Sequence, residues 1–261
     1  MIEPLLADDA FLADVEAARA EPGLHVWWLG QSGFLVQHGK RHVVVDPYLS
    51  DSLTRKYAET ETPHERLTRR VVAPERLGFA DVVLATHSHT DHLDEETLRA
   101  IEAPVLAPAG TVQLARERSG REVTGISEGE MIEVAGFRIE AVAAVHPGDH
   151  CVGYVIAAGP FRLYHSGDTT WVDPGVRGVD VAFVPINGKL GNVDGPEGAR
   201  LAHSVEAALA VPCHYDMFEF NTADPEAFTA ECARLDQPYR VLRNGERLSV
   251  VTAPTRRPAR P

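Results

Sequence analysis

The feature that most constrains this chain is the segment THSHTDH at residues 86–92, which directly follows the apolar run VVLA at residues 82–85. A short continuous apolar run is typical of a strand that is buried on both faces. Asp94, with two glutamates after it, suits the start of a helix. The histidine-rich segment is therefore predicted to lie where a buried strand passes into a helix, and side chains at such a point converge on a crevice.

Four side chains of this segment can bind a metal ion: His87, His89, Asp91 and His92. Neutral imidazole and carboxylate are ligands that suit zinc, manganese and iron. A single ion seldom uses all four groups, whereas two adjacent ions can, so the segment indicates a dinuclear site. The alternative is a polar loop whose histidines are solvated, and it weakens as further candidate ligands are found along the chain.

The order of the other elements predicts a layered α/β protein, in which helices cover the faces of sheets. A helix is expected over residues 8–20, a meander of strands over 24–46, and a polar excursion over 47–77. Further strands are expected at 104–107, around 131–145, and at 152–157, 161–165 and 181–185. No segment resembles a linker, so residues 1–254 are predicted to form one domain, followed by a disordered basic tail at 255–261.

The C-terminal part of the chain predicts two helices and a hairpin. Leu201, Val205 and Leu209 share one stripe of a helix over 196–210, which leads into a strand ending near Cys213. Asp224-Pro225 suits a helix start, with a cap followed by a proline in the first turn. Asn244-Gly245 predicts a two-residue hairpin turn.

Polar residues that can extend the metal site stand at the ends of other predicted strands. His146 follows an apolar run, and Asp168 lies past a strand where Gly167 permits a sharp turn. His214 follows another short apolar run, and Asp46 ends the last strand of the meander. Each of these residues alone could equally be a polar turn residue, but behind THSHTDH they form a coherent set of ligands.

With these residues the chain resembles the metallo-β-lactamase superfamily over about residues 8–235. Within that superfamily it is most similar to the L-ascorbate-6-phosphate lactonase branch. The similar segments are WWLGQSGFLV at 27–36, VDPYLSDSL at 45–53, PING at 185–188 and HYDMFEFNTADPEAF at 214–228. The resemblance implies an αββα sandwich, in which two sheets pack face to face with helices outside and the ligands lie along one edge.

The resemblance also implies a role for each ligand. One divalent ion would be held by His87, His89 and His146, and a second by Asp91, His92 and His214, with Asp168 bridging the two. Asp46 would hydrogen-bond a ligand and fix its orientation. His150 competes with His146 for the same role, and His146 is preferred because it directly ends its strand. Zinc and manganese are the expected ions, and iron also fits these ligands.

The expected reaction is hydrolysis by a water molecule that the two ions activate. The substrate would be an ester or lactone of a small molecule, anionic or neutral, and Asp91 would accept or relay a proton. Asn187, Lys189 and Arg66 are the candidate substrate contacts. The lactonase branch has a basic, arginine-containing segment after PING, whereas this chain has only Lys189 before Arg200, which argues against a phosphorylated substrate.

Other functions fit the same ligands. A phosphodiesterase or nuclease would need a basic arm or channel, and the net charge of −13, from 25 Lys and Arg against 38 Asp and Glu, disfavours a nucleic-acid partner. An iron-dependent oxygenase or diiron reductase is a further alternative, although a diiron enzyme often has glutamate where this chain has His89. A non-catalytic binding protein would not need all seven ligands.

Composition indicates a cytoplasmic protein. The three cysteines include no CxxC pair, which favours a reducing compartment over a disulfide scaffold. The N-terminal segment is acidic, unlike a signal peptide, and no apolar run approaches the length of a membrane span, so no membrane partner is expected. Relatives in the lactonase branch suggest a homo-oligomer.

Overall fold

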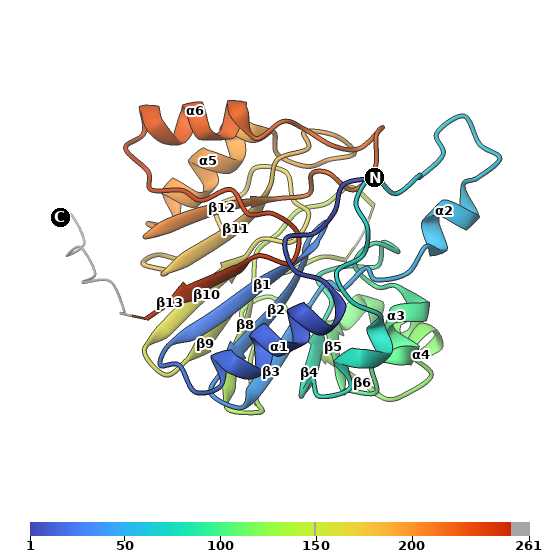
Figure 1. Cartoon of the computed structure of the whole chain (residues 1–261). Coiled ribbons are helices and arrows are strands. Elements are labelled where there is room, and N and C mark those ends of the chain that lie inside the picture. The colour runs from blue at the N-terminus through green and yellow to red at the C-terminus, as the bar shows by residue number, and fades with distance from the viewer. Residues whose placement is uncertain (149, 252–261) are drawn as a thin grey trace.

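Two β-sheets pack face to face in the computed structural model, which describes residues 1–148 and 150–251 (Figure 1). Within these residues the first sheet has seven strands in the order β13-β1-β2-β3-β4-β5-β6. Their bounds are β1 Leu24–Gly30, β2 Gly33–His38, β3 Arg41–Val45, β4 Val82–Leu84, β5 Val105–Pro108, β6 Val123–Ile126 and β13 Arg247–Val250. Strands β13 and β1 to β3 pair antiparallel, and β3 to β6 pair parallel.

The second sheet has six strands over the same described residues, in the order β12-β11-β10-β9-β8-β7. Their bounds are β7 Met131–Val134, β8 Phe137–Val142, β9 Gly153–Ala158, β10 Phe161–His165, β11 Val181–Pro185 and β12 Leu209–Cys213. Strands β10, β11 and β12 are parallel, and β8 runs in their direction because it is two antiparallel steps from β10. Four strands of this sheet therefore end at one edge.

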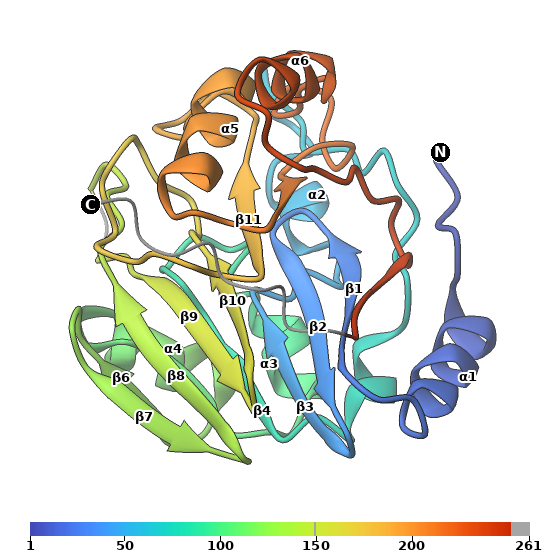
Figure 2. The ribbon, with the colours of Figure 1, turned by 90° about the vertical axis from the view of Figure 1, so that its left-hand side faces the viewer.

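Helices cover the outer face of each sheet (Figure 2). Those on the side of the first sheet are α1 Asp8–Ala18, α3 Glu95–Ala100 and α4 Val112–Ser119, with the short 3-10 helices η1 Pro74–Leu77 and η2 Ala109–Thr111. Helix α2 Ser52–Lys56 lies outside this layer. Those over the second sheet are α5 Gly195–Ser204 and α6 Glu226–Arg234. The arrangement confirms the αββα sandwich.

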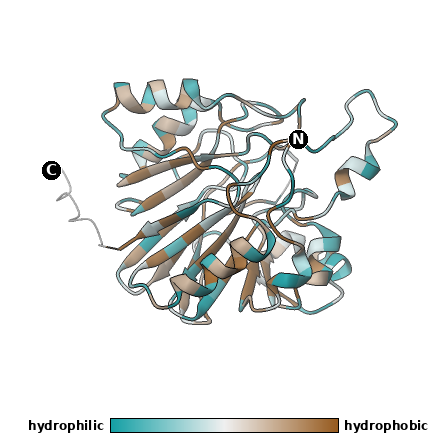
Figure 3. Cartoon of the chain, viewed as in Figure 1, coloured by the Kyte–Doolittle hydropathy of each residue, from teal (hydrophilic) through white to brown (hydrophobic). Residues whose placement is uncertain are grey.

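The alternation of side chains in the strands explains why the sheets are covered on both faces. In β1, Val26 and Trp28 point into the core between the sheets, whereas Trp27 and Leu29 pack in the cluster that includes the inner sides of α1, α3 and α4. All four side chains are at most 2% exposed. Hydrophobic residues accordingly follow the strands, and polar residues gather on the outer sides of the helices (Figure 3).

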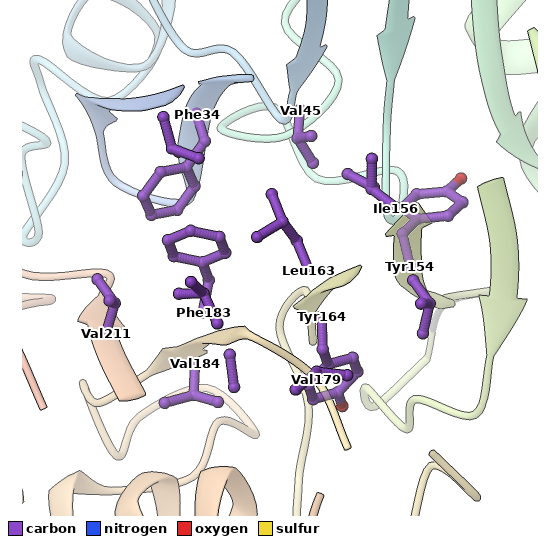
Figure 4. Close-up of a cluster of buried hydrophobic side chains, with 14 of the residues drawn as sticks. Phe34, Val45, Tyr154, Ile156, Leu163, Tyr164, Val179, Phe183, Val184 and Val211 are labelled. Atoms are coloured by element: carbon purple, nitrogen blue, oxygen red, sulfur yellow. The ribbon is translucent and has the colours of Figure 1, made fainter. Parts of the chain in front are cut away.

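Aromatic side chains join the two sheets at the centre of the core (Figure 4). Phe34 of β2 and Phe183 of β11 lie opposite each other, with 4.2 Å between ring centroids. Leu163 of β10 and Val45 of β3 lie in the same cluster. Because Val45 and Leu163 come from strands that are followed by Asp46 and Asp168, the core fixes the relative position of the two sheets at the site.

Most of the predicted strands and helices are present, and the differences have local causes. The helix predicted over 196–210 ends at Ser204, so Leu209 begins β12 and does not belong to the helix stripe. The hairpin at Asn244-Gly245 is wrong: residues 241–243 form no strand, and the Gly245 amide instead donates to the carbonyl of Trp28 in β1. The strand after this turn, β13, pairs with β1.

The polar excursion over 47–77 contains α2 and η1, and α2 projects beside the sandwich in Figure 1. The predicted tail at 255–261 lies outside the described residues, and the single domain over 1–254 stays a prediction. Among the helices that the structure describes, none has the length and apolar character needed to cross a membrane.

Candidate metal centre

All of the candidate ligands lie just after strands that end at one edge of the sandwich. Asp46 follows β3 and the THSHTDH segment follows β4 in the first sheet. His146, Asp168 and His214 follow β8, β10 and β12 in the second sheet. The loops that follow strands of both sheets therefore bring these residues together, and none of the residues lies in a helix.

The predicted ligands form three overlapping groups whose ligand atoms lie within 4.8 Å of one another: His87, His89 and His146; His87, His92 and Asp168; and Asp91, His92 and His214. The first group has the membership implied for one ion. The third has the membership implied for the second ion, and Asp168 lies in the group that links the two. His89 is exposed, whereas the other histidines are buried, so the centre opens to solvent on the side of His89.

The chemistry of the donor atoms fits bound cations. The Nε2 atoms of His87 and His92 are buried and have no hydrogen-bond partner in the described part of the chain. His214 Nε2 lies 3.2 Å from Asp168 Oδ2, and His92 Nε2 lies 3.4 Å from Asp168 Oδ1. A buried imidazole nitrogen without a partner is costly, and a cation among these atoms would supply the missing partner. The residues present therefore fit bound metal ions.

Asp46 fixes the orientation of one candidate ligand. Its carboxylate is fully buried and accepts hydrogen bonds from the Thr86 amide at 2.7 Å and from the Thr86 hydroxyl at 2.6 Å. It also accepts from His92 Nδ1 at 2.7 Å. Because Asp46 accepts from Nδ1, the other ring nitrogen of His92, Nε2, faces Asp168 and is the atom that could bind a metal ion.

The electrostatics of the cluster favour ionised carboxylates. Burial opposes the charge on Asp168, but His214 and His92 outweigh it and hold the pKa of Asp168 well below its usual range. Burial likewise opposes protonation of His92, but Asp168, Asp46 and Asp91 raise the pKa of His92 well above its usual value. Burial and the neighbouring His92 lower the pKa of His87, which favours the neutral form that a metal needs.

Two contacts hold the THSHTDH segment in place. Arg118 of α4 donates to the carbonyls of Ser88 and Leu93 at 2.6 and 3.0 Å. Gly167 has a φ of +62°, and a Cβ atom there would lie 2.8 Å from Cβ of Thr86. The close approach of these two strand ends therefore requires the glycine that the sequence predicted to form the turn before Asp168.

Residues 41–215 match the family described as the beta-lactamase superfamily domain, and this range contains all seven candidate ligands. A UPF0173 metal-dependent hydrolase of Thermoplasma acidophilum is 33% identical over 222 residues, which cover 79% of this chain and 90% of that protein. The chain belongs to the UPF0173 metal-dependent hydrolase family. This membership places it among the metal-dependent hydrolases of the metallo-β-lactamase superfamily.

Solved structures with the same fold include proteins of different activity. A metallo hydrolase of Ignicoccus hospitalis superposes with a TM-score of 0.66 at 22% identity, covering 87% of this chain and 98% of that chain. The diiron β-hydroxylase CmlA of Streptomyces venezuelae superposes with a TM-score of 0.65 at 15% identity, covering 88% of this chain and 55% of that chain. At these identities the likeness shows the fold.

Two side chains that were predicted to contact the substrate, those of Arg66 and Lys189, are engaged with other residues of the chain. Arg66 pairs with Asp51 at 3.0 Å, donates to the carbonyl of Ser50, and lies over the ring of Tyr48 at 4.9 Å, so its guanidinium holds the excursion together. Lys189 Nζ donates to the carbonyl of Phe220 at 2.7 Å. These contacts argue against Arg66 as a substrate ligand and leave Lys189 at the exposed margin.

Asn187 acts on the centre through another residue. Its Oδ1 accepts from Asn192 Nδ2 at 2.9 Å, and the same Nδ2 donates to Asp168 Oδ2 at 2.7 Å. Its own Nδ2 donates to Asn221 Oδ1 at 2.8 Å. Asn187 therefore lies behind the Asp168 carboxylate, which it reaches through Asn192.

Sequence reasoning missed two residues that touch the ligands. Gln31 Nε2 donates to Asp91 Oδ2 at 2.8 Å and lies 3.0 Å from His214 Nε2, and Asn192 supports Asp168. Gln31 has a φ of +52°, so the backbone between two glycines of the GQSG segment turns sharply and places the side chain inward. Gln31 lies in the segment at 27–36 that resembles the lactonase branch, whereas Asn192 lies outside the similar segments, and amide side chains have no diagnostic spacing.

The structure also separates His146 from its competitor. His146 lies in the group with His87 and His89, whereas His150 belongs to none of the three groups. The His150 ring instead packs against Gly110, where an added Cβ would lie 2.3 Å from it. His150 therefore lies apart from the group that contains His146, and the role of His146 as a ligand stays a prediction.

Proposed function

We propose that this chain hydrolyses an ester or lactone of a small molecule with the help of two divalent ions. The observation that carries the proposal is the convergence of seven ligands from both sheets, with donor atoms in three overlapping groups. Zinc and manganese are the proposed ions, and iron is chemically compatible with the same donors. Assignment of the individual ligands follows the grouping described above.

Two bound ions would lower the pKa of a water molecule between them and polarise a carbonyl oxygen. The residues of the chain supply the remaining parts of the reaction. Asp91 is the proposed proton acceptor, and the hydrogen bond from Gln31 Nε2 fixes its Oδ2 atom. Asn192 fixes Oδ2 of Asp168. The exposed edge at His89 is the side from which we propose that substrate enters.

The choice of an ester or lactone over a phosphoryl group rests on charge. Neither predicted cationic contact is well placed: Arg66 is engaged with Asp51 and backbone carbonyls, and Lys189 with Phe220. The net charge of −13 also disfavours a nucleic-acid partner. The similarity of residues 27–36 and 214–228 to the lactonase branch supports a lactone in particular, although the phosphate-binding segment of that branch has no equivalent here.

We also propose that the protein acts in the cytoplasm on a small molecule, as a homo-oligomer, without a nucleic-acid or membrane partner. The described cysteines form no disulfide, and Cys213 and Cys232 are buried. Free thiols are the usual state of cysteine in a reducing compartment.

The test is metal quantification followed by a substrate panel. Protein loaded with zinc, manganese or iron is assayed on p-nitrophenyl esters, lactones, a thioester and bis-p-nitrophenyl phosphate, with and without EDTA, in air and anaerobically. We expect two ions per chain and EDTA-sensitive turnover of esters or lactones. His89→Ala should lower the metal content toward one ion and abolish turnover.

Three results would contradict the proposal. Turnover of the phosphodiester without turnover of esters would favour a phosphodiesterase. Loss of activity under anaerobic conditions would favour an iron-dependent oxygenase, for which the diiron hydroxylase with the same fold is a precedent. Full activity of His89→Ala would remove that residue from the site.

A further inference from the structure

An open cavity of about 380 Å³ lies directly against the candidate metal centre. Its walls come from the turn after β5, from the residues that follow β6, and from the connection between β8 and β9. His146 lines it, and Val152 on the same wall donates its amide to the carbonyl of Thr86, the residue before His87. The cavity therefore shares a wall with the first group of ligands.

The described lining is mixed, with hydrocarbon surface beside the imidazole rings of His146 and His150. Pro108, Ala109, Ile126, Ala144 and Val152 contribute hydrocarbon surface, and Ser127 and Cys151 contribute small polar groups. Among the described lining residues there is no lysine or arginine, and the single carboxylate is that of Glu128, which is exposed. The hydrocarbon part of this surface gains free energy by covering apolar groups. With no lysine or arginine among the described lining residues, the cavity offers a phosphate, sulfate or carboxylate only the imidazoles of His146 and His150.

We propose that this cavity binds the uncharged, apolar part of the substrate, so that the substrate is a neutral ester or lactone with an alkyl or similar apolar group. The inference rests on the proposed hydrolysis, because it assumes that the reacting carbonyl lies at the adjacent ligands. The volume falls in the range of natural small-molecule pockets, about 300–1,000 Å³. An apolar group in the cavity would place the adjoining carbonyl next to His146.

Substitution at the rim provides the first test. Ala109 lines the cavity and is exposed, so leucine can be accommodated there at the expense of cavity space. With Ala109→Leu we expect KM for p-nitrophenyl hexanoate to rise about tenfold relative to the acetate ester, because the longer chain loses apolar contact. The acetate kcat should stay unchanged. Ala135→Leu is the matched control, since Ala135 lines a separate cavity of about 360 Å³ at the β7–β8 turn, the opposite end of β8 from His146.

Charge provides the second test. An ester with a carboxylate at the far end of its chain, mono-p-nitrophenyl adipate, should have a higher KM than the hexanoate ester. Glu128→Lys should reduce the difference in KM between the two esters, whereas Glu133→Lys, in the separate cavity, should leave that difference unchanged. A carboxylate ester that binds as well as the hexanoate ester would overturn the proposal.

Cys151 gives a readout that does not depend on turnover. It lines the cavity and is partly exposed, whereas Cys213 and Cys232 are buried, so iodoacetamide should label it first. The neutral probe hexanamide should slow alkylation of Cys151 in the wild type, and Ala109→Leu should lose this protection. Absence of EDTA-sensitive ester hydrolysis in the wild type would defeat the proposed function. Ester hydrolysis with no change in the hexanoate-to-acetate ratio in Ala109→Leu, or with no protection of Cys151, would defeat the cavity proposal alone.

Discussion

At the scale of single residues, the candidate centre depends on amide side chains that carry no charge. Gln31 and Asn192 each donate to one carboxylate, Asp91 and Asp168 respectively. A carboxylate held by such a bond has a fixed orientation, and its remaining lone pairs would be available to hold a metal ion. This explains how a buried cluster with few cationic side chains keeps its geometry.

Substitution of Asn192 tests this support. We predict that Asn192→Ala weakens binding of the second ion about 10- to 100-fold, because Asp168 loses the hydrogen bond that orients Oδ2. Asn187→Ala, one hydrogen bond further from the ligand, should have a smaller effect. Competition with a chromophoric chelator measures both affinities. Equal affinity in Asn192→Ala and the wild type would show that Asp168 is held by its other neighbours.

A second prediction concerns His42, a buried residue of β3. Burial and the nearby Arg19 lower the pKa of His42 to about 4, while Asp81 and Glu16 oppose this shift. The folded protein therefore binds a proton at His42 less readily than the unfolded chain, whose pKa is near 6.5. Neutral His42 contributes its full stability above about pH 6.5, and the contribution falls as the pH decreases toward about 4.

Urea unfolding as a function of pH checks this sign. Between pH 7 and about pH 4.5, the free energy of unfolding of the wild type should fall by roughly 2 kcal/mol more than that of His42→Leu. Leucine removes the titrating group and leaves an apolar side chain in contact with Phe79, whose ring centroid is 4.8 Å from that of His42. Parallel pH profiles for the two proteins would contradict the assignment.

At the scale of elements, the sequence predicts strands and helices most accurately where the hydrophobic pattern and the turn residues agree. The three strands over 24–46 and the start of α3 at Asp94 are examples, since Asp94 accepts from the Thr97 amide as a cap should. Helix α4 and strand β6 were missed. The helix has three arginine or glutamate residues in VQLARERS and only a narrow apolar side, and β6 contains a glycine.

The wrong prediction of a hairpin at Asn244-Gly245 shows a different limit of prediction from sequence. Asn244-Gly245 does form a tight turn, with φ of +76° at the glycine, but the strand after it pairs with β1 instead of with the residues before the turn. Local turn chemistry cannot tell which strand offers an unpaired edge. In contrast, the ligands were predictable because histidine and aspartate at strand ends carry chemistry of their own, while Gln31 and Asn192 acquire theirs only through tertiary contacts.

At the scale of the whole molecule, the candidate centre joins the two sheets. Histidines 87, 89 and 92 follow a strand of the first sheet, while His146, Asp168 and His214 follow strands of the second. Direct hydrogen bonds also cross at this edge, from Tyr154 to the carbonyl of Ala85 and from the Val152 amide to that of Thr86. Bound ions would therefore connect the sheets at an edge where the apolar core already meets polar side chains.

This position leads to a prediction about metal removal. An ion that binds the folded chain and not the unfolded chain adds about 2.7 kcal/mol at one hundred times its dissociation constant. For a chain of this size that corresponds to a rise in Tm of roughly 5–11 °C. We predict that EDTA lowers the Tm of the loaded protein by this order, that zinc or manganese restores it, and that Asp168→Ala shows a smaller metal-dependent shift because both ions lose a shared ligand. Calorimetry with loaded and chelated protein measures the effect, and a Tm that is independent of metal in the wild type would show that the two sheets are held together by the core alone.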